Sequence, residues 1–268
     1  MIATNEASQR ALDLYDKGLG RVPKSVWQNV ELEWLNLAEN GLRSIPVEVG
    51  NLVHLRMLDL GHNLLASLPE ALGNLTKLKF LYISNNQLRA VPSSLWTLKS
   101  LIYLNITDNR LRSLPEEIGN LSNLIELRLY NNRLTVLPDS IGTLKNLREL
   151  HVMGNQLTSL PESIGKLTHL RKLMLEGNKI ELLPHSLGGL RQLTDLDLRN
   201  NRLTHIPNSI GSLKRLRFLD LRANRFTELP SNIAKLANLE KLDLRWNKLL
   251  AIPKWLAKLE ERGCIVYT

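Results

Sequence analysis

Charged side chains recur at a fixed interval in the C-terminal half of this 268-residue chain, and their chemistry is that of binding. An aspartate returns every 23 residues, and an arginine follows each aspartate two residues later. Opposite charges at this spacing can neutralise one another as a surface network, which we favour, or contact a charged partner. Together with two aromatic neighbours they form one candidate partner-binding set, which comprises Asp197, Arg199, Phe218, Asp220, Arg222, Asp243, Arg245 and Trp246.

Large apolar and aromatic side chains form a second set in the N-terminal half. They recur at the same interval of 23 residues or lie two to four positions further on. Exposed aromatic residues are candidate anchors of protein interfaces, although the same side chains could stack on one another and only shield the surface. We favour binding of a protein or peptide by this set, which comprises Trp34, Met57, Phe80, Tyr82, Tyr103 and Tyr130.

Catalytic residues do not form a visible constellation in this chain. The phosphate-binding pattern GxxxxGK[ST] and the kinase elements HRD and DFG are missing. We interpret Cys264, the only cysteine, as a small buried hydrophobe and not as a nucleophile. The histidines fall at scattered positions without the spacing of metal ligands; they are His54, His62, His151, His169, His185 and His205. We therefore expect no enzymatic activity, no cofactor and no metal.

The elements that position these side chains are repeats of 23 residues. Ten consecutive segments between residues 32 and 261 read close to LxxLxLxxNxLxxLPxxIGxLxx, without insertion or deletion. A period in this range with this leucine and asparagine pattern indicates a leucine-rich-repeat solenoid. The expected fold is α/β: a curved horseshoe with a parallel concave β-sheet and short helical or 3-10 turns on the convex side.

Each position of the repeat has a physical role. The alternating leucines at places one, four and six predict a short strand whose leucines face the core. The asparagine at place nine can satisfy backbone groups where the chain leaves the strand, and the proline at place fifteen suits the turn towards the convex side. Two apolar residues three apart then fit a short helical or 3-10 turn.

The chain divides into three parts. Residues 1–31 are expected to form an N-terminal cap and a degenerate repeat, marked by Pro23, which lies 23 residues before Pro46. Within this part, residues 4–13 are expected to form a short helical cap. Residues 32–261 hold the ten repeats, with a last helical turn over 255–262, and residues 262–268 are expected to be a capping strand that covers the open end.

The net charge of +9 favours acidic partners. Basic residues directly after the asparagines form a rim, but no aromatic side chain is regularly interleaved, so we do not expect nucleic acid as a partner. No stretch approaches the roughly 18 apolar residues of a membrane span. A single cysteine and no visible secretion signal predict a cytoplasmic protein, or one delivered into a host cell if it is an effector. We expect a monomer. The rim residues are Arg110, Arg133, Lys179, Arg202, Arg225 and Lys248.

The segments LPEEIGNLSNL at 114–124 and LPESIGKLTHL at 160–170 resemble the repeats of the Ras-group intracellular leucine-rich-repeat proteins. They are also similar to bacterial relatives, including Roco-associated and effector proteins. The resemblance implies a non-enzymatic scaffold that binds a protein or peptide on its concave face, in intracellular signalling. The alternatives are a bacterial effector that targets a host protein, the regulatory subunit of an enzyme on another chain, and an engineered repeat.

Overall fold

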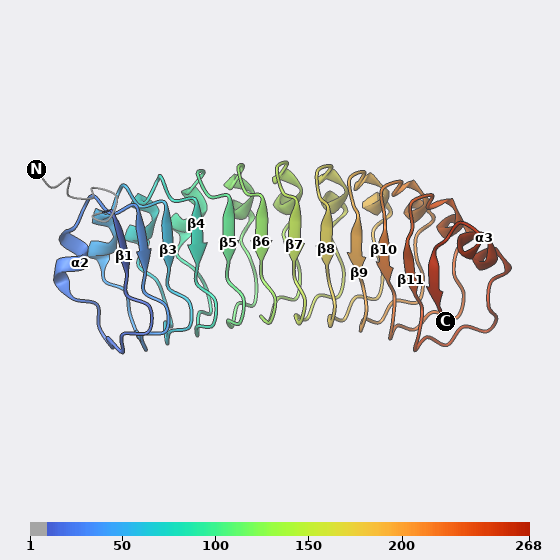
Figure 1. The fold of residues 1–268 in the computed structure, drawn as a ribbon, viewed down its shortest axis with the longest axis horizontal. Coiled ribbons are helices and arrows are strands. Elements are labelled where there is room, and N and C mark those ends of the chain that lie inside the picture. The colour runs from blue at the N-terminus through green and yellow to red at the C-terminus, as the bar shows by residue number, and fades with distance from the viewer. Residues whose placement is uncertain (1–9) are drawn as a thin grey trace, which may run out of the picture.

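A computed structural model describes residues 10–268 as one solenoid with a twelve-stranded parallel sheet (Figure 1). Neighbouring strands in the sheet are also neighbours in the sequence, from β1 to β12. The strands are β1 (Ala11–Asp13), β2 (Trp34–Asn36), β3 (Met57–Asp59), β4 (Phe80–Tyr82), β5 (Tyr103–Asn105), β6 (Glu126–Arg128), β7 (Glu149–His151), β8 (Lys172–Met174), β9 (Asp195–Asp197), β10 (Phe218–Asp220), β11 (Lys241–Asp243) and β12 (Ile265–Tyr267). The predicted leucine-rich-repeat solenoid is confirmed.

The register of the sheet follows the repeat period. Trp34 lies opposite Met57, 23 residues later, and the same step relates every pair of strands from β1 to β11. The last step differs, because Lys241 lies opposite Ile265, 24 residues later. Residues at one repeat position therefore form straight rows across the sheet, which is the property that brings distant side chains together.

Short 3-10 helices line the convex side of each repeat. Every one follows a proline in an extended conformation, such as Pro115 with φ −80° and ψ 163°. Proline has no backbone N–H to donate to a preceding carbonyl, so the helix begins after it. These helices are η1 (Val47–Asn51), η2 (Glu70–Asn74), η3 (Ser93–Thr97), η4 (Glu116–Asn120), η5 (Asp139–Thr143), η6 (Glu162–Lys166), η7 (His185–Gly189), η8 (Asn208–Ser212), η9 (Ser231–Lys235) and η10 (Lys254–Leu256).

Leucines fill the space between the sheet and the 3-10 helices. Leu35, Leu58, Leu81 and Leu104 on successive strands are fully buried. Because side chains alternate along a strand, the residues on either side of these leucines face away from the core. The core thus fixes which side chains the sheet presents to a partner.

Buried asparagines connect each repeat to the one before it. Asn132 accepts the backbone N–H of Leu111 at 3.0 Å and donates to the carbonyl oxygens of Ile106 and Leu129 at 2.9 and 3.1 Å. The predicted structural role of these amides is confirmed. The asparagine amides thus satisfy backbone groups in the turns that follow the strands, and they hold the turns of adjacent repeats in register.

The two ends of the solenoid differ from its middle. Residues 11–13 form strand β1, so the predicted helix over 4–13 is wrong for that part, because the alternating burial of an edge strand prevails there; residues 4–9 lie outside the described part of the chain. The N-terminal helix is instead α2 (Lys24–Gln28), which buries Trp27. At the other end η10 continues into α3 (Ala257–Glu260), and β12 pairs with β11.

Candidate partner-binding surface

A row of large side chains crosses β2 to β5 on the outward side of the sheet. Trp34, Met57, Phe80 and Tyr103 lie in register on successive strands. Phe80 is the most open of the four, with 36% of its surface exposed, and the other three are half-buried. We call this row, with two tyrosines beside it, the aromatic lane; its members are Trp34, Met57, Phe80, Tyr82, Tyr103 and Tyr130.

The tyrosines of the aromatic lane pack against their neighbours. The rings of Tyr82 and Tyr103 lie 4.9 Å apart between centroids, and the Arg128 guanidinium lies 5.7 Å from the centroid of Tyr103. Burial raises the pKa of Tyr103 to about 12, although the charge of Arg128 acts the other way. Tyr130 lies two residues after the end of β6 and is half-buried. The aromatic lane is therefore partly self-packed and partly open.

The aspartates and arginines of the C-terminal half bind one another. Arg222 Nη2 lies 2.6 Å from Asp220 Oδ2, and Arg245 Nη2 lies 2.7 Å from Asp243 Oδ2. Arg222 Nε also lies 3.5 Å from Asp243 Oδ2 and so joins the two pairs. These aspartates and arginines therefore have the geometry of the self-neutralising network that we favoured from the sequence. Charges already paired in this way have less to offer a partner.

Burial and pairing move the pKa values of these aspartates in opposite directions. Burial raises the pKa of Asp197 to about 6, although the backbone N–H and charge of Arg199 lower it. Burial acts in the same way on Asp243, but hydrogen bonds from Arg245 and the charge of Arg222 prevail and hold its pKa below the usual value. Asp197 is therefore the less compensated carboxylate.

Trp246 is the most exposed aromatic side chain of the C-terminal set, with 70% of its surface open. It follows β11 with φ 60°, a left-handed conformation that bulky residues rarely adopt. The guanidinium groups of Arg222 and Arg245 lie 5.9 and 5.5 Å from its ring centroid. Phe218 on β10, 37% exposed, belongs to the same half of the sheet. Trp246 and Phe218 are the open members of this second set.

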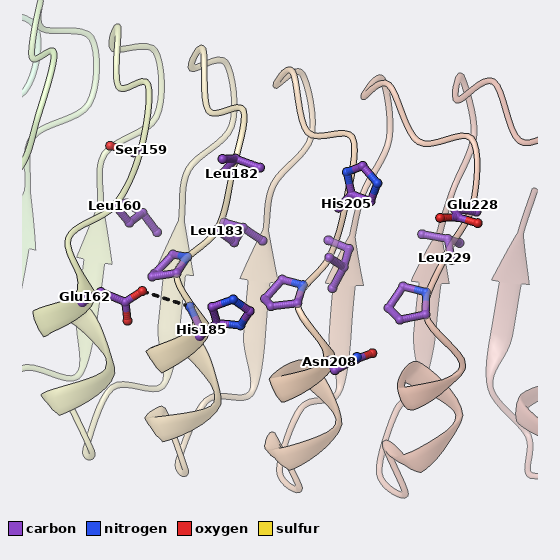
Figure 2. Close-up of a pocket in the computed structure, with 14 residues that line it drawn as sticks. Ser159, Leu160, Glu162, Leu182, Leu183, His185, His205, Asn208, Glu228 and Leu229 are labelled. Carbon is purple, nitrogen blue, oxygen red and sulfur yellow. Dashed lines mark hydrogen bonds between the residues drawn. The ribbon is translucent and has the colours of Figure 1, made fainter.

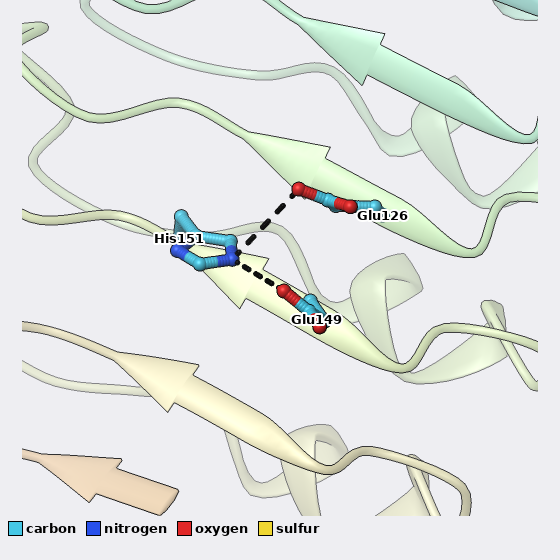
Figure 3. Close-up of side chains that lie close together, drawn as sticks. All are labelled: Glu126, Glu149 and His151. Atoms are coloured by element: carbon cyan, nitrogen blue, oxygen red, sulfur yellow. Dashed lines mark hydrogen bonds and ion pairs between the residues drawn. The ribbon is translucent and has the colours of Figure 1, made fainter.

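Between the two sets, β6 and β7 carry a charged cluster that the sequence patterns did not single out (Figure 3). His151 Nε2 lies 3.0 Å from Glu149 Oε2 and 4.0 Å from Glu126 Oε1. These three side chains are of the types that hold metal ions, and the three ligand atoms lie within 4.8 Å of one another. Arg128 and Lys172 also bind the two carboxylates, so a metal ion must compete with both cations. The sequence feature that could have revealed this cluster is the change from aromatic to acidic residues at the third position of the repeat.

A groove of about 740 Å³ opens on the loops that lead into the 3-10 helices (Figure 2). Pro184, Pro207 and Pro230 from three successive repeats line it. Glu162 Oε1 accepts the backbone N–H of His185 in the next repeat at 3.2 Å. The lining comes from repeat positions that recur along the whole solenoid, so the groove is a consequence of the repeat geometry.

Cys264 has little access to solvent, as expected of a small hydrophobe. Only 4% of its surface is exposed, and burial raises the pKa of its thiol. None of the helices in residues 10–268 has the length and apolar character that a membrane crossing requires.

Family models place the chain among the leucine-rich-repeat proteins. A model described as "Leucine-rich repeat region" matches residues 9–102 and 92–168, and one described as "Leucine rich repeat" matches 145–203, 168–226 and 191–249. The chain therefore belongs to the leucine-rich-repeat family. The match is to the broad family, and the narrower resemblance to Ras-group and Roco-associated proteins stays a prediction. A comparison with curated proteins gave no match.

Solved structures of plant and bacterial proteins have the same fold. The plant peptide hormone receptor RGFR1, solved in complex with RGF2, is 31% identical with a TM-score of 0.77 over 85% of this chain and 38% of its own. The Arabidopsis thaliana receptor kinase ectodomain GASSHO1/SCHENGEN3, solved with CASPARIAN STRIP INTEGRITY FACTOR 2, is 33% identical with a TM-score of 0.76 over 88% and 32%. InlJ of Listeria monocytogenes is 25% identical with a TM-score of 0.82 over 98% and 53%.

The chain thus spans about a third of the length of these two plant receptor chains. Two of the three similar structures are complexes with a named partner. Leucine-rich-repeat proteins are in general protein-binding scaffolds.

Proposed function

We propose that this protein is a non-enzymatic scaffold that binds a protein or peptide segment on the concave face of its sheet. The observation that carries the proposal is the aromatic lane, because it concentrates large apolar side chains where the register forces them outward. Aromatic anchors of this kind supply much of the binding energy at protein interfaces. The complexes of the similar plant receptors with their partners support a peptide as one class of ligand.

The scaffold acts as a monomer in intracellular signalling, in the reducing environment of the cytoplasm, where its single cysteine stays a thiol. It binds no metal, no cofactor and no nucleic acid on this face. The aromatic lane is the first binding site, and the open side chains Phe218 and Trp246 form the second, with the aspartates and arginines beside them as its polar surroundings.

Selection from a random peptide library displayed on phage, with the purified protein as target, tests the proposal. Peptides that bind the wild type should lose at least about tenfold in affinity when Trp34, Phe80 and Tyr103 are replaced together by alanine. The matched control replaces the exposed Val136 and Leu182, which lie in the loops away from the concave face, by alanine. An equal loss in both variants, or no loss in the lane variant, would show that the aromatic lane is not the site.

A further inference from the structure

The positive charge of this protein is concentrated on one flank. The flank consists of three positions in each repeat: the two residues before the first leucine and the residue directly after that leucine. These positions lie at the edge of the sheet where the strands begin, which is the upper edge in Figure 1. Between residues 53 and 238 these positions contain no aspartate or glutamate. Exposed basic residues stand there instead, among them Lys79, Lys99, Arg148, Arg171, Arg191 and Arg215.

Among the residues that the structure describes, none neutralises these cations. Within residues 10–268 the six side chains have no ion pair and donate no hydrogen bond, in contrast to the paired arginines of the concave face. The two ends of the flank are closed by acidic residues. Glu33 pairs with Arg56 at 3.1 Å, and Glu240 pairs with Arg217 at 2.6 Å. The charge between these ends is free to act on a partner.

A groove of about 530 Å³ lies in the middle of the flank. Lys79 lines one end, Arg148 and His169 line the other, and the half-buried Ile102 and Ile125 lie between them. Lys79 and Arg148 are three repeats apart, which corresponds to about 14 Å at the spacing of neighbouring strands. An extended polypeptide covers this distance in about four residues, and its residues i, i+2 and i+4 point to one side.

We propose that this basic flank binds an extended acidic polypeptide segment, with carboxylates four residues apart on Lys79 and Arg148 and an apolar side chain between them on Ile102 and Ile125. Charge complementarity selects the two acidic residues of the segment, and the apolar surface of Ile102 and Ile125 selects the residue between them. This surface is separate from the aromatic lane, so one scaffold holds two partners or two segments of one partner.

The composition of the flank favours a polypeptide over other polyanions. No Phe, Tyr or Trp occupies its positions between residues 53 and 238. Single-stranded nucleic acid is held by aromatic side chains on which bases stack, and surfaces that insert into anionic membranes use large apolar side chains beside the basic ones. No aromatic side chain is present at these positions, and the large apolar side chains there are limited to Val53, Ile102 and Ile125, of which the two isoleucines are half-buried.

The test is binding of a fluorescein-labelled peptide with the core Glu-Ser-Val-Ser-Glu, measured by fluorescence anisotropy at about 50 mM salt, where surface charges are weakly screened. Replacement of both glutamates by glutamine should abolish binding. The variant Lys79→Glu with Arg148→Glu should bind at least about tenfold more weakly. The control variant Arg110→Glu with Arg133→Glu makes the same charge change on the opposite rim. Both arginines are exposed there and have no ion pair within residues 10–268. This variant should bind within about twofold of wild type.

The outcome also separates this site from the concave face. Binding of the acidic peptide should survive the triple alanine variant of the aromatic lane, since that variant leaves every flank cation in place. Lack of binding by the wild type, an equal loss in the rim control, or tighter binding of an oligothymidine or of phosphatidylserine vesicles than of the peptide would each overturn the proposal.

Discussion

Asp197 and Asp243 occupy the same repeat position two repeats apart, yet their arginines hold them differently. Arg245 donates to Asp243 through Nε at 2.9 Å and through Nη2 at 2.7 Å. Arg199 instead directs Nη2 to Glu176, and its Nε lies 3.2 Å from Asp197 Oδ2 without a well-aligned hydrogen bond. A glutamate one repeat earlier has therefore diverted the guanidinium and left Asp197 buried with a weaker partner.

This difference predicts opposite effects of two matched substitutions at pH 7.5. Asp197→Asn should stabilise the fold, by no more than about 3 kcal/mol, because the folded chain no longer has to bury an ill-compensated charge. The asparagine still accepts the backbone N–H of Arg199. Asp243→Asn should destabilise the fold by about 1–3 kcal/mol, because it weakens the hydrogen bonds from Arg245. Denaturant midpoints of both variants measure the effect.

The pH dependence provides the control for Asp197. Its folded pKa of about 6 lies above the value of about 3.9 in an unfolded chain, so the stability it contributes is present below pH 4 and is lost as pH rises to 6. The advantage of Asp197→Asn should therefore grow across this interval and level off above it. An advantage that is the same at pH 4 and pH 7.5 would contradict the assignment.

Asn132→Ala should destabilise the fold. The substitution leaves the buried N–H of Leu111 without its partner, and an unsatisfied group of this kind costs about 1–3 kcal/mol. It also removes one of the two donors to the carbonyl of Ile106, which keeps the amide of Asn109 at 3.3 Å. Urea melts of the purified variant measure the loss. Asn131→Gly is the matched control, because Asn131 is exposed and its φ of 54° suits glycine. A midpoint for Asn132→Ala as high as that of the control would show that the buried amide is dispensable.

Gly165→Ala should also destabilise the fold, through a steric conflict between neighbouring 3-10 helices. A Cβ atom at this position would overlap the backbone oxygen of Ser186 in the next 3-10 helix. Such overpacking costs about 1–3 kcal/mol. Ala234 occupies the same repeat position near the C-terminal end, and Ala234→Gly should cost no more than about 1 kcal/mol. Thermal melts that rank the two variants in the opposite order would refute the explanation.

The sequence predicted the fold well because every repeat position has one physical task. The asparagines and the prolines recur without exception across the ten repeats, so one assignment of each applies to all of them. The N-terminal helix over 4–13 was predicted from polar composition and failed at residues 11–13. The repeat period did carry the signal for a strand, because Leu12 and Leu14 lie 23 residues before Leu35 and Leu37 and so occupy the strand positions of the degenerate repeat.

The candidate surface was predicted only in outline. The period alone placed Trp34, Met57, Phe80 and Tyr103 on one row of the sheet. The geometry around Glu176, Asp197 and Arg199 depends on rotamers chosen between repeats, which a periodic pattern does not contain. The basic flank was missed for another reason. Its cations occupy three repeat positions, so no single ladder contained them all, and only their common edge in the fold reveals them.

Tyr103 provides a spectroscopic test of how the aromatic lane is packed. Its folded pKa of about 12 lies above the ordinary value of about 10, so the phenol should be among the last to ionise in an absorbance titration at alkaline pH. Between pH 10 and 12 the unfolded chain releases this proton while the folded chain retains it, so stability falls as pH rises. Tyr103→Phe should remove the late phenol and reduce that fall by about 1 kcal/mol at pH 11.

Tyr15, exposed at the N-terminal end, gives the control, since Tyr15→Phe should leave both the late phenol and the fall in stability unchanged. Ionisation of every tyrosine near pH 10 would mean that Tyr103 is solvated and that the aromatic lane is more open than its geometry implies.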